Sequence, residues 1–197
     1  MSSALKERIV SKFIAQVTSV GGHVAPVHHL AGARDYVLKL AMASNAKRIV
    51  LCTRGLVPDL LTPDAALEQL EIARQTDMPR ERFFNAVKMA DIGVPLVDLA
   101  VAETGTVILA TSDESERLAT ALPRIHVALL PRHKLVFSLQ DAEPYISSFL
   151  ASATGGVVSL ISGPSRTADI EGRLVIGVHG PRQLHICLLD QELSGGR

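Results

Sequence analysis

The chain has 197 residues, 47% of them hydrophobic, and its 20 lysine and arginine residues balance 20 aspartate and glutamate residues. The apolar fraction supports a core and excludes an intrinsically disordered chain, while zero net charge with five Phe, two Tyr and no Trp argues against a general nucleic-acid-binding protein. Because charges or prolines interrupt every apolar run and the first residues lack the pattern of a secretory signal, we expect a single-domain cytoplasmic protein that binds neither nucleic acid nor a membrane.

Helical spacing of apolar residues and short apolar runs follow one another along the chain. The first helix ends at Gly21 and Gly22, because glycine commonly terminates a helix. In chain order we expect a helix at 4–20, a strand at 23–27, a helix at 31–44, a strand at 48–52, helices at 65–74 and 82–91, strands at 96–102 and 106–110, a helix at 115–122, a strand at 124–130, a helix at 141–150, and strands at 157–161, 174–176 and 184–189.

The strand–helix–strand order near the start is typical of a parallel sheet flanked by helices. We therefore expect an α/β fold with a mostly parallel sheet, built as one domain over residues 1–197 with an N-terminal helix within residues 1–22. Prolines punctuate residues 53–80, and we interpret this stretch as an insertion or lid that carries an exposed helix.

The turn Glu103-Thr104-Gly105 separates two apolar runs and predicts a hairpin, because glycine is common in such short connections. A carboxylate held at the end of a strand can be a nucleophile, a base or a hydrogen-bond acceptor for a substrate. The alternative is a solvated Glu103 that bonds neighbouring N–H groups. Thr104 and Thr106 place two hydroxyl groups beside it and are candidate ligand-binding residues.

The segment SGPSRTADIE at 162–171 follows an apolar strand, and we expect it to open a helical turn. Ligands of open α/β sheets bind at the carboxyl ends of strands, and free N–H groups at a helix start attract anions. Ser165, Arg166 and Thr167 would add hydroxyl and guanidinium donors to such a carboxylate or phosphate site. In the alternative, Arg166 pairs with Asp169 or Glu171 inside a tight turn and Thr167 caps the helix.

The segment GVHGPR at 177–182 is a second glycine-bearing loop, in which His179 is a candidate acid, base or hydrogen-bond donor. A rigid loop with His179 bonded to carbonyl groups is the alternative. The seven histidines do not occur at metal-ligand spacing, and the adjacent His28 and His29 would point to opposite faces of a strand, so we expect no metal site. Cys52 and Cys187 lie in apolar strands, where buried structural thiols are usual.

Four segments taken together, AETGT at 102–106, SGPSRTADIE at 162–171, GVHGP at 177–181 and LHICLLD at 184–190, resemble the LUD-domain (lactate-utilisation) family and most closely its small LutC/YkgG-type members. The resemblance implies the NagB/RpiA/CoA-transferase-like fold. It also implies a role, with two partner proteins, in the oxidation of L-lactate to pyruvate. In that system a larger relative carries a LUD domain fused to an iron–sulfur domain.

The sequence has neither a C-x-x-C-x-x-C run nor a dinucleotide fingerprint, so we expect no cofactor. The first hypothesis is therefore a non-redox accessory of the lactate-oxidising system, which binds iron–sulfur LUD-family partners and a small carboxylate or phosphate. The second is an enzyme that acts on an acyl-CoA or phosphorylated substrate with Glu103 as its reactive carboxylate. Glu103-Thr104-Gly105 is similar to the E-x-G turn of family I CoA transferases, although the glycine-rich oxyanion loop of those enzymes is absent here.

Overall fold

The computed structural model describes residues 3–52, 60–61, 68–170 and 173–190. Its helices are α1 (Ser3–Ser19), α2 (Leu30–Ala43), α3 (Arg80–Met89), α4 (Glu114–Ala119) and α5 (Leu139–Ser152), with 3-10 helices η3 (Gln75–Asp77) and η4 (Arg132–Lys134). The strands are β1 (His23–Val27), β2 (Arg48–Leu51), β3 (Glu71–Arg74), β4 (Ile92–Val94), β5 (Leu99–Val101), β6 (Thr106–Thr111), β7 (Ile125–Pro131), β8 (Leu135–Val136), β9 (Val157–Ile161), β10 (Arg166–Ile170), β11 (Arg173–Ile176) and β12 (Gln183–Leu189).

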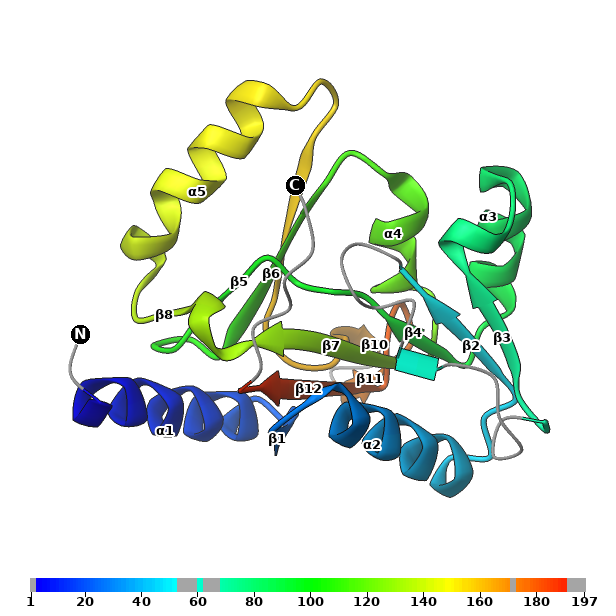
Figure 1. Ribbon diagram of the computed structural model, residues 1–197, viewed down its shortest axis with the longest axis horizontal. Coiled ribbons are helices and arrows are strands. Elements are labelled where there is room, and N and C mark those ends of the chain that lie inside the picture. Colours follow the sequence, from blue (N-terminus) through cyan, green and yellow to red (C-terminus); the bar gives the residue numbers. More distant parts are fainter. Residues whose placement is uncertain (1–2, 53–59, 62–67, 171–172, 191–197) are drawn as a thin grey trace.

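The largest sheet has six parallel strands in the order β1-β12-β7-β4-β2-β3 (Figure 1). Because side chains alternate along a strand, β7 and β12 supply residues to both faces. Val127 and Cys187 pack with α2 on one face, and Ala128 and Ile186 pack with α1 on the other. The expected α/β fold with a mostly parallel sheet and flanking helices is confirmed.

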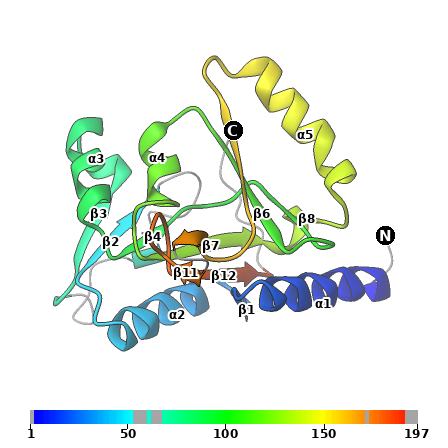
Figure 2. The same cartoon turned by 180° about the vertical axis from the view of Figure 1, so that it is seen from behind.

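A second sheet, in the order β8-β5-β6-β9, lies on the α1 side of the first. β5 and β6 form the expected antiparallel hairpin, and β9 pairs with the other edge of β6. α5 covers the outer face of this sheet, where Ala142 packs with Val101 and Ile108. Figure 2 shows α5 on the side of the molecule opposite α1 and α2.

Helix α5 begins at a capping box, in which the Ser138 hydroxyl accepts the Asp141 N–H and the Asp141 carboxylate accepts the Ser138 N–H. This arrangement satisfies two of the backbone donors that a helix start leaves free.

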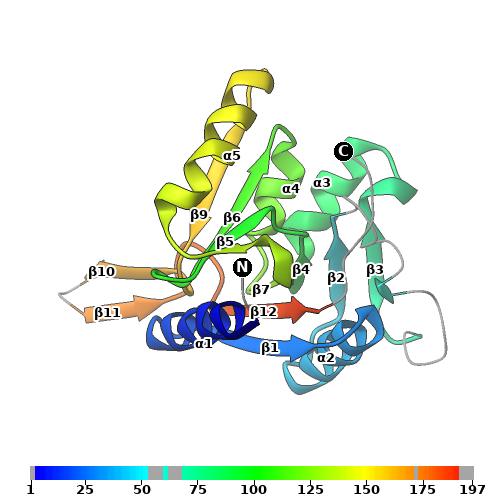
Figure 3. The ribbon, with the colours of Figure 1, turned by 60° about the vertical axis from the view of Figure 1, so that its left-hand side comes forward.

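Two of the expected helical segments are strands. The expectation of a helix over 65–74 is wrong for residues 71–74, which form β3 as an edge strand beside β2, while residues 65–67 lie outside the described part. The segment after Ser165 does not open a helical turn either, because residues 166–170 form β10 and pair with β11. Figure 3 shows this two-stranded hairpin extending from the body of the molecule.

Two further strands were not expected at all. β4 occupies the centre of the large sheet and β8 is an edge of the second sheet. Of the stretch interpreted as an insertion or lid, residues 53–59 and 62–67 lie outside the described residues, whereas Leu60 and Leu61 are fully buried in the core. None of the helices in the described ranges has both the length and the apolar run that crossing a membrane requires.

Candidate functional site

Glu103 lies in the turn between β5 and β6 and contacts the start of α5. Its Oε1 atom accepts the Leu139 N–H at 3.2 Å, and its own N–H donates to the Phe137 carbonyl at 2.9 Å. A carboxylate at the start of a helix stabilises the helix through the free N–H groups and the helix dipole. The Glu103 side chain is exposed, and its described contact is with backbone.

The rest of this turn is held against α1 and against the loop that follows β9. Gly105 has φ +66°, and a Cβ atom there would lie 2.6 Å from the Val17 nitrogen, so a larger residue cannot replace it without movement of α1. The Thr104 hydroxyl bonds the Thr106 hydroxyl at 2.7 Å, and the Thr106 hydroxyl bonds the Ser162 hydroxyl at 2.7 Å. This row of three hydroxyl groups joins the hairpin turn to the Ser162–Ser165 loop.

The Ser162–Ser165 loop and the Gly177–Arg182 loop are bonded to each other. The Ser165 N–H donates to the Pro181 carbonyl at 2.8 Å, and the Ser165 carbonyl accepts the Gly177 N–H at 2.9 Å. A Cβ atom on Gly180 would lie 2.9 Å from the Ser165 Cβ atom, so the two loops meet at van der Waals distance. The Ser165 N–H is therefore already used and is not a free donor for an anion.

The Arg166 side chain of the expected anion site is used in another contact. The Arg166 guanidinium donates to the carbonyl oxygen of Val20, just after α1. Thr167 is half-buried on β10, and Asp169 also falls in β10, although the Asp169 side chain and residue 171 lie outside the described part.

These loops lie at the amino ends of the parallel strands, not at the carboxyl ends where sequence reasoning placed the anion site. The Arg182 N–H donates to the Arg124 carbonyl, one residue before β7 begins. A Cβ atom on Gly163 would lie 2.6 Å from the Val20 oxygen, three residues before β1. The reason is that β9, which precedes the first loop, belongs to the second sheet and runs antiparallel to β6.

A cavity of about 430 Å³ lies between these loops, β9 and the carboxyl end of α4. Ser162, Ser165 and His179 line it, so the structure brings together candidates from both glycine-bearing loops. Glu103, Thr104, Thr106, Arg166 and Thr167 are not among its lining residues.

His126 on β7 lines the same cavity and was not singled out from the sequence. Its side chain is fully buried, and neither Nδ1 nor Nε2 has a hydrogen-bond partner among the described residues. Burial, with a smaller contribution from the charge of His185, lowers the pKa of His126 to about 3, so the ring is neutral near pH 7. An unbonded buried polar group costs free energy, and one that lies beside a cavity can regain a hydrogen bond from a molecule bound there.

The cavity reaches His126 at a place where Gly93 lets α4 pack close to the sheet. Gly93 on β4 is the register neighbour of His126, and a Cβ atom on Gly93 would lie 2.0 Å from the Ala119 carbonyl oxygen. Only glycine lets the last turn of α4 approach the sheet this closely. The helix in turn places Arg117 and Thr120 on the cavity wall.

The cavity therefore combines the Arg117 guanidinium, the neutral imidazole of His126, the ring of His179 and several hydroxyl groups. The Arg117 side chain is 41% exposed, and its ion pair with Glu114 is long, at 3.7 Å. A guanidinium binds a carboxylate through charge-assisted hydrogen bonds, and a neutral imidazole has one donor and one acceptor nitrogen. These groups can hold a small carboxylate that carries a second oxygen.

Comparison with known proteins places the chain in a family. The LUD domain model matches residues 10–189. The chain is 35% identical over 134 residues to lactate utilization protein C of Halalkalibacterium halodurans, covering 66% of this chain and 57% of that protein. It is 32% identical over 124 residues to lactate utilization protein C of Bacillus subtilis, covering 62% and 52%. The chain spans about half the length of the curated relatives it matches.

A solved structure shares the fold. The crystal structure of a DUF162 family protein from Deinococcus radiodurans superposes with a TM-score of 0.65 at 17% sequence identity, over 93% of this chain and 98% of that one. At this identity the likeness concerns the fold alone.

Proposed function

The chain belongs to the LUD domain family, and from that premise we propose that it is a non-redox accessory component of an L-lactate-utilisation system, which holds a small carboxylate in the cavity at the amino ends of β7 and β12. The unbonded, fully buried imidazole of His126 on the cavity wall carries this proposal. A 2-hydroxy or 2-oxo acid offers this ring the oxygen that it needs to satisfy one of its nitrogens.

The carboxylate of the ligand would bind Arg117 at the cavity mouth, and the hydroxyl groups of Ser162 and Ser165 would donate to its oxygens. The neutral His126 ring would then contact the oxygen on carbon 2. A donor nitrogen suits the keto oxygen of pyruvate, and an acceptor nitrogen suits the hydroxyl group of lactate.

In this proposal, partner proteins that carry iron–sulfur clusters transfer the electrons. The 197 residues include two cysteines, Cys52 and Cys187, and both are buried in separate core clusters. Burial raises the pKa of the Cys187 thiol to about 12, so it remains protonated and is a poor metal ligand.

The contact of Glu103 supports this proposal over an acyl-CoA enzyme. A glutamate nucleophile must present a free carboxylate to a pocket with donors for the oxyanion. Glu103 instead accepts a backbone N–H of α5.

Calorimetric titration with L-lactate and pyruvate tests the proposal. We expect Arg117→Ala to weaken binding by about 1.5–3 kcal/mol, because it removes a charge-assisted hydrogen bond. Arg8→Ala removes the same charge from an exposed position on α1 and is the matched control, with no change expected.

Two results would contradict the proposal. One is the absence of binding by either acid at millimolar concentration. The other is a covalent adduct on Glu103 after incubation with acyl-CoA, detected by mass spectrometry, which would make the protein an acyl transferase.

A further inference from the structure

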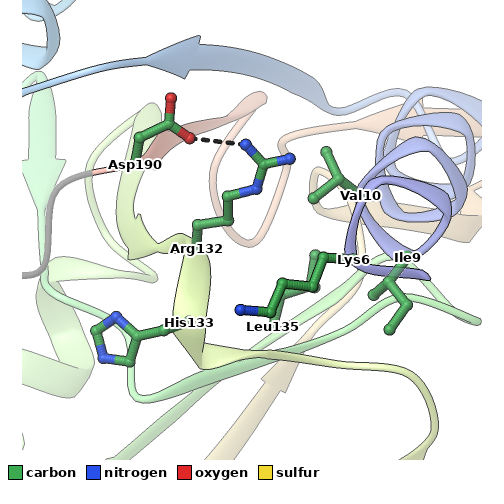
Figure 4. Close-up of a pocket in the computed structure, with 7 residues that line it drawn as sticks. All are labelled: Lys6, Ile9, Val10, Arg132, His133, Leu135 and Asp190. Atoms are coloured by element: carbon green, nitrogen blue, oxygen red, sulfur yellow. Dashed lines mark hydrogen bonds and ion pairs between the residues drawn. The ribbon is translucent and has the colours of Figure 1, made fainter. Parts of the chain in front are cut away.

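A second cavity, of about 290 Å³, lies at the opposite end of the parallel sheet. It is bordered by the residues that follow β7 and β12 and by the first turns of α1 (Figure 4). This is the carboxyl edge of the strands, where open α/β sheets bind their ligands. The proposed lactate-utilisation site does not include it.

Arg132 stands at the centre of a row of charged side chains beside this cavity. Its Nη1 atom lies 2.9 Å from Oδ1 of Asp190, and its Nη2 atom lies 2.6 Å from Oε1 of Glu7. The other oxygen of Asp190 lies 2.9 Å from Nδ1 of His28. The guanidinium and imidazole groups hold the pKa of Asp190 below its usual range, through hydrogen bonds first and charge second.

The two carboxylates on Arg132 are not equivalent. Asp190 directly follows β12, and its N–H donates to the Val27 carbonyl, so its backbone is fixed at the sheet edge. Glu7 projects from α1 with 63% of its side chain exposed. A surface ion pair of this kind contributes little free energy, so another anion can replace Glu7 on Arg132 at small cost.

Lys6 supplies a second cation from α1, and it has no ion-pair partner among the described residues. Its side chain extends across the cavity toward the segment that carries Arg132 and His133 (Figure 4). The apolar part of the lining consists of Ile9, Val10 and Leu135. The lining thus offers two cations, of which Arg132 is held by ion pairs, one anion at the sheet edge and a hydrocarbon surface.

We propose that this carboxyl-edge cavity binds a small organic anion between Lys6 and Arg132, and that Glu7 competes with the ligand for Arg132. The ligand class is one anionic oxygen group on a short apolar body, because the cations bind the first part and the aliphatic wall covers the second. A carboxylate and a phosphate monoester both meet this description.

Titration of the full chain at low salt distinguishes the two sources of the anionic group. The probes are butyrate and butyl phosphate, each compared with the short anion that lacks the apolar body, acetate and inorganic phosphate. We expect at least one of the longer probes to bind more tightly than its short counterpart, and the tighter of the two identifies the head group.

Variants at Lys6 and Glu7 must change ligand affinity in opposite directions, because Lys6 binds the ligand whereas Glu7 competes with it for Arg132. We expect Lys6→Ala to weaken binding about tenfold, and Glu7→Gln to strengthen it about fivefold by removing the competing carboxylate. Glu81→Gln, at an exposed position on α3, changes the net charge equally and is the matched control, with no change expected. Lys6 and Glu7 are exposed, so neither variant threatens the fold.

The proposal is overturned if no probe binds, if Glu7→Gln fails to strengthen binding, or if Glu81→Gln strengthens it as much. It is also overturned if Arg117→Ala abolishes the signal, because the probes would then occupy the cavity at the amino ends of the strands. Failure of lactate to bind there leaves this result unchanged, so the two proposals stand or fall separately.

Discussion

The cavities at the two ends of the parallel sheet differ in whether their polar groups already have partners. At the amino ends of the strands, the buried His126 ring has no hydrogen-bond partner among the described residues. At the carboxyl ends, Arg132 is bonded to two carboxylates before any ligand arrives. The first site gains a new hydrogen bond when it binds, whereas the second exchanges one ion pair for another. We therefore expect the first to depend on packing and burial and the second on ionic strength.

Replacement of Gly93 by alanine should break the amino-end site and leave the carboxyl-end site intact. The added Cβ atom would meet the Ala119 carbonyl oxygen at 2.0 Å, so α4 must move away from the sheet. We expect a loss of about 3 kcal/mol in the free energy of unfolding, measured by urea denaturation, and loss of lactate binding with butyrate binding retained. Gly32→Ala, where the nearest atom is 3.4 Å away, is the control and should lose nothing. Equal losses in both variants would contradict this account.

The pH dependence of stability should separate the two ends next. The pKa of His126 is about 3 in the folded protein and about 6.5 in an unfolded chain, so between these values only the unfolded chain binds the proton. The contribution of the neutral His126 ring to the free energy of unfolding is fully present above about pH 6.5 and is lost progressively as the pH falls toward 3. We expect His126→Leu to lack about 2 kcal/mol of the loss that the parent protein shows between pH 7 and pH 5 in denaturant titrations. His185, with a pKa lowered to about 4, contributes in both proteins and cancels in the difference. Parallel pH profiles would show that His126 is not buried as described.

Ionic strength should reveal the smallest difference. We expect Arg132→Ala to cost about 1 kcal/mol in the free energy of unfolding at low salt, because its ion pairs are partly exposed. This cost should shrink in 0.5 M salt (about a 4 Å screening length), whereas the difference between the parent protein and His126→Leu should not change. Thermal or urea unfolding at two salt concentrations measures both. A salt-independent cost for Arg132→Ala would mean that packing, not charge, holds this end together.

The periodicity of apolar residues correctly located the helices that bury one face. It failed for segments that become strands through pairing with a neighbouring strand. Residues 4–20 and 31–44 alternate apolar and polar positions at helical spacing because each helix covers one face of the sheet. Residues 71–74 belong to a run of good helix formers, and only their position beside β2 makes them a strand. The same holds for residues 166–170, whose strand exists through its pairing with β11.

The site was partly visible in the sequence for a related reason. Glycines marked the two loops, and Ser165 and His179 do line one cavity. His126 lies in the apolar strand RIHVALL, where nothing local distinguishes a bonded from an unbonded ring. Its surroundings include Gly93 and α4, which are distant from it in sequence. The signal in the sequence is a histidine inside a strand that is otherwise apolar, because a buried polar side chain needs a hydrogen-bond partner.

Helix α1 lines the carboxyl-end cavity and, with Val20 directly after it, packs against the Gly105 turn and the Ser162–Ser165 loop near the amino-end cavity. This arrangement gives the molecule a mechanical property. Its first turns carry Lys6 and Glu7 at the carboxyl edge. About 15 Å away along the axis, Val17 packs against Gly105, and the Val20 oxygen directly after the helix accepts the Arg166 guanidinium. A rod held at both ends cannot slide or turn at one end alone. We therefore expect a displacement of α1 caused at the Arg132 end to reach the Ser162–Ser165 loop, which contacts Val20 directly after the helix.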